Sequence, residues 1–300
     1  MPCDSGRCRD LDGAIIRGMF MVELIGKEKY TLGEGPYYDP RFQRLSWVDI
    51  PEKKLWIMGA DRKKYAVDLP QKAGAAVPLA DSEGFLLALE DGLYIYEDGQ
   101  IKRHTDLSNV YKSYWRSNDA KADALGRLWF GASVDDGIHE DEGNLYTLSG
   151  SAPVIAVDGT KISNGMAWNK NKTKFYFSDS PKQAVFVYDY DEKNASLSNE
   201  KVLFQVSDGV SDGLTIDADD NLWIAFWGGS RIEKRDGRTG ALLETVPVPA
   251  KQVTSCCFGD EDLMTLYITT AGIGQDGEYD GCLFRYRTDV KGVKPDYFMA

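Results

Sequence analysis

The sequence DADDNLWI, residues 217–224, joins a polar turn directly to a run of bulky apolar side chains. Asp and Asn favour tight turns, whereas aromatic and β-branched side chains favour β-strands. The sequence DALGRLWF, residues 123–130, has the same order of turn and strand. A turn and a strand that return together predict a repeated β unit.

Strand-like runs of this kind recur along the chain, and amphipathic helical stretches are scarce. The clearest runs are residues 45–47, 84–88, 128–130, 175–177, 222–224 and 266–268. They follow one another in steps of about 41 to 47 residues, the length of one four-stranded propeller blade. Six such units, over roughly residues 30–295, predict an all-β, six-bladed β-propeller. A two-sheet sandwich is the alternative, but it leaves the period unexplained.

The repeat also divides the chain into a domain and a tail. We expect residues 21–300 to form a single propeller domain. Residues 1–20, which include Cys3 and Cys8, are expected to form a loosely ordered N-terminal tail. Trp47, Trp129 and Trp223 recur at blade positions, so we expect them in the core.

Composition narrows the range of partners. The 300 residues include 35 basic and 47 acidic side chains, and the net charge of −12 repels polyanions. We therefore expect neither nucleic acid nor an anionic membrane as a partner. We also expect a monomer. The two histidines share no ligand spacing, which excludes a His-rich metal site. Five cysteines without a CxxC pair indicate reduced thiols and a cytoplasmic location.

Four polar residues fall in one register of the repeat. The units align on the residue that follows the first strand of each, namely Asp39, Asp123, Asn169 and Asp217. Five positions upstream of these stand Glu34, Asn118, Asn164 and Asp212. The first strand of every propeller blade lines the central channel, so these four side chains are predicted to form a ring around its axis.

Such a ring suits a hard divalent cation. Carboxylate and amide oxygens are the ligands that these ions prefer, and two carboxylates repel each other unless a positive charge lies between them. Alternatively, Asn and Asp simply mark turns at these positions, because both are ordinary turn residues. The shared register and the presence of Glu34 favour the metal site.

Several motifs resemble those of one known family. They run in order along nearly the whole chain after about residue 22, and they are GEGP at 33–36, RSND at 116–119 with Lys121 and Asp123, SNG at 163–165, SDG at 211–213 and TSCCFG at 254–259. In these motifs the sequence is similar to the family of senescence-marker protein (regucalcin), the gluconolactonases and the luciferin-regenerating enzymes. Members of this family are six-bladed propellers with one catalytic divalent metal ion, and many hydrolyse sugar lactones.

The resemblance implies a role for individual residues. Glu34, Asn164 and Asp212 would be the metal ligands, and Arg116 and Asn118 would bind substrate. Asp136, in the acidic loop 134–142, corresponds best to a further substrate-contacting acid of the family. Ca²⁺ is the expected ion, with Zn²⁺, Mn²⁺ and Mg²⁺ as alternatives.

These residues together predict a metal-dependent lactonase. A metal ion polarises the lactone carbonyl, and Asp212 serves both as a ligand and as the general base for the attacking water. Two alternatives stay open: a metal-dependent phosphotriesterase on the same propeller, and a non-catalytic calcium-binding propeller. A Ser-His or Cys-His mechanism is disfavoured, because neither His104 nor His139 stands beside a nucleophile motif.

Overall fold

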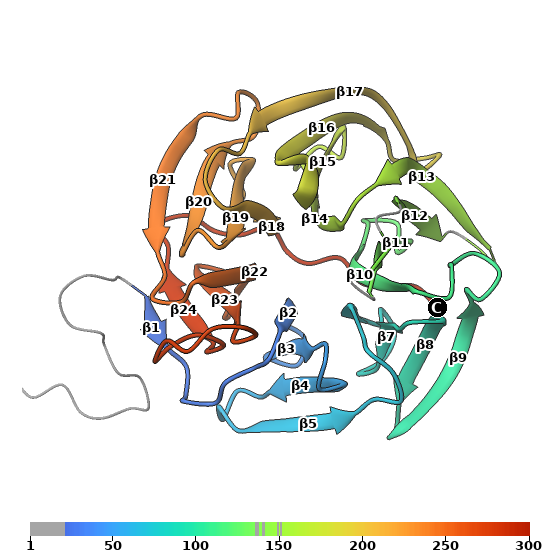
Figure 1. Cartoon of the computed structure of the whole chain (residues 1–300), viewed down its shortest axis with the longest axis horizontal. Coiled ribbons are helices and arrows are strands. Elements are labelled where there is room, and N and C mark those ends of the chain that lie inside the picture. The colour runs from blue at the N-terminus through green and yellow to red at the C-terminus, as the bar shows by residue number, and fades with distance from the viewer. Residues whose placement is uncertain (1–21, 136–137, 140–141, 149, 151) are drawn as a thin grey trace, which may run out of the picture.

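The computed structural model describes residues 22–135, 138–139, 142–148, 150 and 152–300. These residues form six four-stranded antiparallel sheets arranged as blades around a central channel (Figure 1). The predicted all-β, six-bladed propeller is therefore confirmed. The expected tail, residues 1–20, lies outside the described residues.

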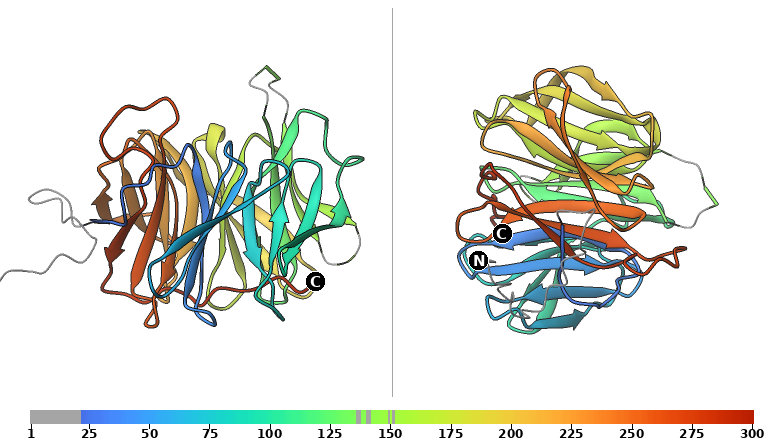
Figure 2. Two further views of the ribbon diagram at one scale, coloured as in Figure 1. Left: turned by 90° about the horizontal axis from the view of Figure 1, so that it is seen from below. Right: turned by 90° about the vertical axis from the view of Figure 1, so that its left-hand side faces the viewer.

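Each blade runs from an inner strand at the channel to an outer strand at the rim (Figures 1 and 2). The first three blades comprise β2(Gly33–Asp39), β3(Arg44–Asp49), β4(Lys54–Met58) and β5(Lys64–Asp68); β6(Ala75–Pro78), β7(Phe85–Ala88), β8(Gly92–Glu97) and β9(Gln100–Asp106); and β10(Trp115–Ala122), β11(Leu128–Val134), β12(Gly143–Leu148) and β13(Pro153–Thr160). The fourth and fifth comprise β14(Ser163–Trp168), β15(Lys174–Asp179), β16(Ala184–Asp191) and β17(Ser196–Gln205), with the 3₁₀ helix η1(Ser180–Lys182) after β15; and β18(Val210–Ile216), β19(Asn221–Trp227), β20(Arg231–Asp236) and β21(Leu242–Pro247).

The sixth blade closes the ring with strands from both ends of the chain. It contains β22(Gln252–Gly259), β23(Thr265–Ala271), β24(Phe284–Arg287) and β1(Glu23–Leu24). Glu23 pairs with Arg285 in the ladder, and Arg285 Nε also donates to Glu23 Oε2 at 2.7 Å. The side chain of Leu24 packs into the core of this blade. The six units are therefore not all consecutive, because the outermost strand of the last blade lies before the first unit.

The repeated turn has a common hydrogen-bonding pattern. Asp217 Oδ1 accepts from the backbone nitrogens of Asp219 at 3.0 Å and Asn221 at 2.9 Å, and its Oδ2 accepts from Trp223 Nε1 at 3.1 Å. Asp123 and Trp129 repeat the last bond at 3.0 Å. One carboxylate thus closes the turn and satisfies the indole of a fully buried tryptophan, which explains why Asp and Trp recur together.

The C-terminal segment crosses the channel. We call the end of the channel where the inner strands begin the near end, and the end where they finish the far end. Residues 292–299 run across the far end from the fifth blade to the second (Figure 1). Gly292 bridges to Asp217, Phe298 bridges to Leu79, and Asp296 Oδ2 accepts from Lys172 Nζ at 3.0 Å. A cavity of about 90 Å³ lies between this segment and the inner strands.

Two observations bear on the environment of the protein. Within the described residues, no helix has the length and apolarity needed to cross a membrane. Cys256, Cys257 and Cys282, the cysteines among those residues, are all free thiols.

Candidate functional site

A bulge in four inner strands determines where the predicted ring residues point. The ladders of β2, β10, β14 and β18 shift register between Glu34 and Tyr37, Ser117 and Ala120, Ser163 and Met166, and Ser211 and Leu214. A β-bulge bends its strand and redirects a side chain. Asn118, Asn164 and Asp212 lie within these shifts at the near end of the channel, whereas Glu34 is the last paired residue before the shift in β2.

The glycines after the ring residues allow the inner strands to approach closely. A β-carbon at Gly165 would lie 2.2 Å from the backbone nitrogen of Leu214, and one at Gly213 would lie 2.1 Å from Ser255 Oγ. Gly35 has a φ of +54°, which favours glycine for conformational reasons. Both crowding and backbone conformation thus explain the x-Gly pattern in the sequence.

Hydrogen bonds fix the orientation of the Asn164 amide. Ser180 Oγ donates to the carbonyl oxygen of Ser211 at 2.7 Å, so it can accept from Asn164 Nδ2, which lies 2.7 Å away. The Asn164 oxygen consequently points to the opposite side, where Asn118 Nδ2 donates to it at 3.1 Å. Asn164 is buried, so this arrangement leaves a correctly oriented amide oxygen in the ring.

Negative charge is concentrated beside this oxygen. Burial and the charge of Asp119 raise the pKa of Glu34 to about 8. Burial and the charges of Glu34 and Asp119 raise the pKa of Asp212 well above its usual range, and Arg116 opposes the shift. Asp212 is buried, and within the described residues its Oδ1 has no hydrogen-bond partner. The carboxylates of Glu34 and Asp212 therefore lie near each other in a site that favours a cation or a proton.

The described residues contain no group of three His, Cys, Asp or Glu side chains placed to hold a metal ion. The expected metal site is thus not shown by the structure. The predicted ligand set consists of two carboxylates and one amide, Glu34, Asp212 and Asn164. Its chemistry fits a hard divalent cation, because it offers only oxygen atoms and one of them, Asp212 Oδ1, is buried with no hydrogen-bond partner among the residues that the structure describes.

Arg116 is held beside the ring by three hydrogen bonds. Its Nη1 donates to Asn118 Oδ1 at 2.8 Å and to the carbonyl of Ser117 at 2.9 Å. Its Nε donates to Asp135 Oδ1 at 2.9 Å, and Lys72, from the loop between the first and second blades, also pairs with Asp135. Arg116 and Asn118 are therefore brought together by a direct hydrogen bond.

The acid in contact with Arg116 is one that the sequence analysis did not select. Asp136, the predicted substrate-contacting residue, lies outside the described residues. Asp135, directly before it, is the residue that orients Arg116. The signal in the sequence was the pair of consecutive aspartates, which by itself does not say which of the two faces the arginine.

Three residues after Asn118 in β10 stands Lys121, which reaches two other inner strands. Lys121 Nζ donates to the carbonyl oxygens of Met166 at 2.9 Å and Leu214 at 2.5 Å. Burial lowers the pKa of Lys121, and the charge of Asp119 opposes this shift. Lys121 also lines the cavity above the C-terminal segment. The sequence shows Lys121 in a motif but gives no indication of these contacts.

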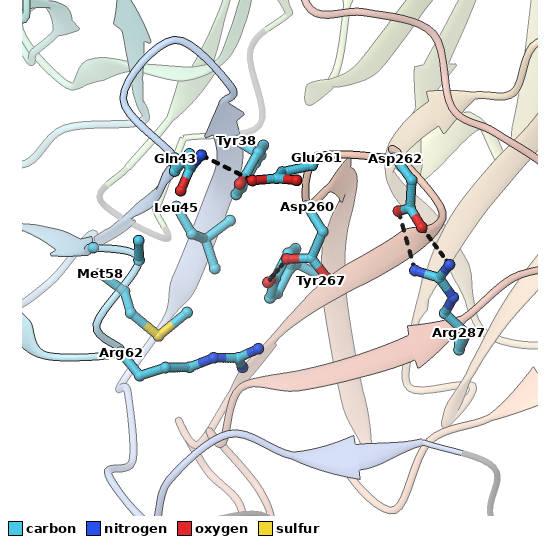
Figure 3. A pocket seen from close by; sticks show the side chains of 12 residues that line it. Tyr38, Gln43, Leu45, Met58, Arg62, Asp260, Glu261, Asp262, Tyr267 and Arg287 are labelled. Atoms are coloured by element: carbon cyan, nitrogen blue, oxygen red, sulfur yellow. Dashed lines mark hydrogen bonds and ion pairs between the residues drawn. The ribbon is translucent and has the colours of Figure 1, made fainter.

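A larger cavity, of about 440 Å³, opens on the far face between the first and sixth blades (Figure 3). Its carboxylates already have partners within the protein. Asp260 Oδ1 accepts from Tyr267 Oη at 2.7 Å, and Arg287 Nη1 donates to Asp262 Oδ1 at 3.1 Å. None of the ring residues lines this cavity, so we place the candidate site at the near end of the channel.

Comparison with known proteins gives consistent matches over most of the chain. A family model described as the SMP-30/gluconolactonase/LRE-like region matches residues 32–272. A Bacillus subtilis (strain 168) protein named as a candidate sugar lactone lactonase, YvrE, is 35% identical over 276 residues, which cover 88% of this chain and 94% of that protein.

Two solved structures have the same fold. A luciferin-regenerating enzyme aligns with a TM-score of 0.87 and 34% identity, covering 93% of this chain and 99% of the other. A calcium-binding protein, regucalcin, from Agrobacterium tumefaciens strain C58 aligns with a TM-score of 0.87 and 25% identity, covering 92% and 97% of the two chains.

Proposed function

The chain belongs to the SMP-30/gluconolactonase/LRE-like family, and from this membership we propose that it hydrolyses sugar lactones with the help of one divalent metal ion. The observation that carries the proposal is the buried, unpartnered Oδ1 of Asp212. It lies in the same ring as the Glu34 carboxylate, beside an arginine that can bind substrate. The relative named as a candidate sugar lactone lactonase supports the substrate class.

We assign Glu34, Asn164 and Asp212 as the metal ligands. Two negative charges and one neutral oxygen suit Ca²⁺ best, in agreement with the related calcium-binding regucalcin, and Zn²⁺, Mn²⁺ and Mg²⁺ are alternatives. Bound there, the ion would act as a Lewis acid on the lactone carbonyl. The protein contributes the orientation of the ligands, of which the Asn164 amide is the clearest example.

Arg116 and Asn118 are proposed to orient the sugar. The Nε and Nη1 donors of Arg116 are occupied within the protein, whereas its Nη2 has no hydrogen bond to any of the described residues. A planar guanidinium that is held on one edge by Asp135 presents the donors of the other edge in a fixed direction. These donors can bind sugar hydroxyl groups or the oxyanion that forms during acyl transfer.

Asp212 is proposed as the general base. Burial and the charges of Glu34 and Asp119 raise its pKa above the usual carboxyl range, which increases its affinity for a proton. Asp212 takes a proton from water as the water oxygen attacks the lactone carbonyl carbon. The ring C–O bond then breaks, Asp212 passes the proton it took from water to the departing oxygen, and a hydroxy acid is released with the Asp212 carboxylate regenerated.

The decisive experiment compares substrates and metals on one protein sample. The purified protein is stripped with a chelator, and hydrolysis of a sugar lactone and of an organophosphate triester is measured with Ca²⁺, Zn²⁺, Mn²⁺ or Mg²⁺ added back. We expect activity to be lost on stripping and restored by metal, with the lactone hydrolysed faster. Circular dichroism should show the fold retained throughout, because six packed blades do not depend on one ion.

Three results would contradict the proposal. Full lactone turnover by the stripped protein would exclude a metal-dependent mechanism. Preferential turnover of the triester would favour the phosphotriesterase. Tight metal binding without turnover of either substrate would favour a non-catalytic calcium-binding protein.

A further inference from the structure

A single ammonium group connects three of the inner strands that carry the ring. Lys121 belongs to β10, and its Nζ reaches across the channel to the carbonyl oxygens of Met166 in β14 and Leu214 in β18. Met166 stands two residues after Asn164, and Leu214 stands two residues after Asp212. The lysine therefore binds each strand two residues after its proposed metal ligand.

These carbonyl groups lie where the backbone is least regular. The register shifts of β14 and β18 end at Met166 and Leu214. At a bulge the ladder is locally disrupted, so the strand relies on other contacts to define its path. Two charge-assisted hydrogen bonds from one donor atom are stronger than neutral ones and are directional. These two hydrogen bonds fix the backbone path at the bulges of both strands.

Placing an amine here is costly for the fold. Burial disfavours the charged form of Lys121, and an apolar side chain of similar length would avoid that cost. The nearby Asp119, which is itself buried, compensates part of it. A purely structural filler would not need the charge, whereas two carbonyl oxygens that must be held together do need a donor with several N–H groups.

We propose that Lys121 is a positioning residue that sets the spacing of Asn164 and Asp212 and thereby the affinity of the channel for a divalent cation. This role rests on the proposed metal site. For removal of Lys121, this role predicts a change in cation affinity opposite to the one that charge alone predicts. Removing a positive charge near a bound cation strengthens binding if charge alone matters. Removing the hydrogen bonds that connect β14 and β18 weakens cation binding if Lys121 positions the ligands.

The test is calorimetric titration of Ca²⁺ into the full-length protein and two variants. Lys121→Met removes the donor while keeping an unbranched side chain. Lys234→Met is the matched control, because Lys234 is also partly buried and its Nζ lies 3.7 Å from Asp217 Oδ2, just beyond the end of β18. We expect Ca²⁺ to bind Lys121→Met about tenfold to a hundredfold more weakly, as for other residues that orient ligands. The affinity of Lys234→Met should stay within about twofold of the wild type.

The Ca²⁺ affinity of the folded variant tests the positioning role of Lys121. Unchanged or tighter Ca²⁺ binding by folded Lys121→Met would overturn the positioning role. If Lys121→Met shows no cooperative thermal transition, Lys121→Leu, which also lacks the donor, is measured against the same criterion. A wild-type protein that binds no Ca²⁺, Zn²⁺, Mn²⁺ or Mg²⁺ would overturn the proposed metal site, and with it this role, before any variant is compared.

Discussion

Asp212 and Asn164 are proposed as ligands of the same ion, yet only the first can accept a proton during the reaction. Asp212→Asn keeps one ligating oxygen but removes a charge and the base. We expect weaker metal binding and a kcat reduced by about two to four powers of ten that saturating metal does not restore. Asn164→Ala removes a neutral ligand, and its kcat should largely recover at high metal concentration.

The measurement is kcat for both variants across a metal titration. Equal recovery of the two would mean that Asp212 is only a ligand. The base would then have to be sought elsewhere, with Asp136 as the next candidate.

Arg116 is expected to act on the substrate and not on the metal. Arg116→Lys replaces a planar group held by Asp135 and Asn118 with a point charge. We expect a higher KM or a lower kcat for lactones, while metal affinity stays within about threefold of the wild type. Steady-state kinetics and a metal titration on the same sample check this, and loss of bound metal would show that Arg116 supports the ligands instead.

At the scale of a strand, close approach of neighbouring blades limits what can follow a ring residue. Gly213→Ala would place a β-carbon 2.1 Å from Ser255 Oγ and 2.9 Å from Ser255 Cα. We expect the free energy of unfolding to fall by about 1 to 3 kcal/mol, because the inner strands must move apart. Gly59→Ala is the control, since its nearest atom would lie 3.4 Å away. Urea unfolding of both variants tests this, and equal stability would mean that the strands adjust freely.

The strands also show why some elements could be predicted and others not. The turn at Asp217 could be read from sequence, because one carboxylate serves both the turn and Trp223 and so leaves a recurring pattern. The closing strand β1 could not, because two residues carry no periodicity and its pairing with β24 is a contact between the chain ends. The channel function of Lys121 was equally hidden, since it depends on carbonyl groups, which every residue has.

Across the whole molecule, the site should make stability depend on pH. The pKa of Glu34, raised to about 8 from an ordinary 4.5, means that the folded metal-free protein keeps a proton that the unfolded chain has already released between these values. The contribution of Glu34 to stability is therefore greatest below this range and is lost as pH rises through it, and Asp212 acts in the same direction. A cation can replace the lost proton, so its stabilising effect should grow with pH.

We therefore expect Ca²⁺ to raise the Tm more near pH 8.5 than near pH 6, as measured by differential scanning calorimetry at about equal ionic strength. Glu34→Gln should reduce this difference, because it removes one of the two groups that exchange a proton for the ion. A Tm increase of the same size at both pH values would show that the carboxylates are already ionised in the metal-free protein.

The C-terminal segment, anchored by Phe298 against the second blade and by Asp296 to Lys172, gives the channel a floor. A propeller without such a segment would have a channel that is open at both ends. Under the proposed function, the lactone and the hydroxy acid would both pass through the near end, and release of the product there would contribute to the turnover rate alongside bond breaking.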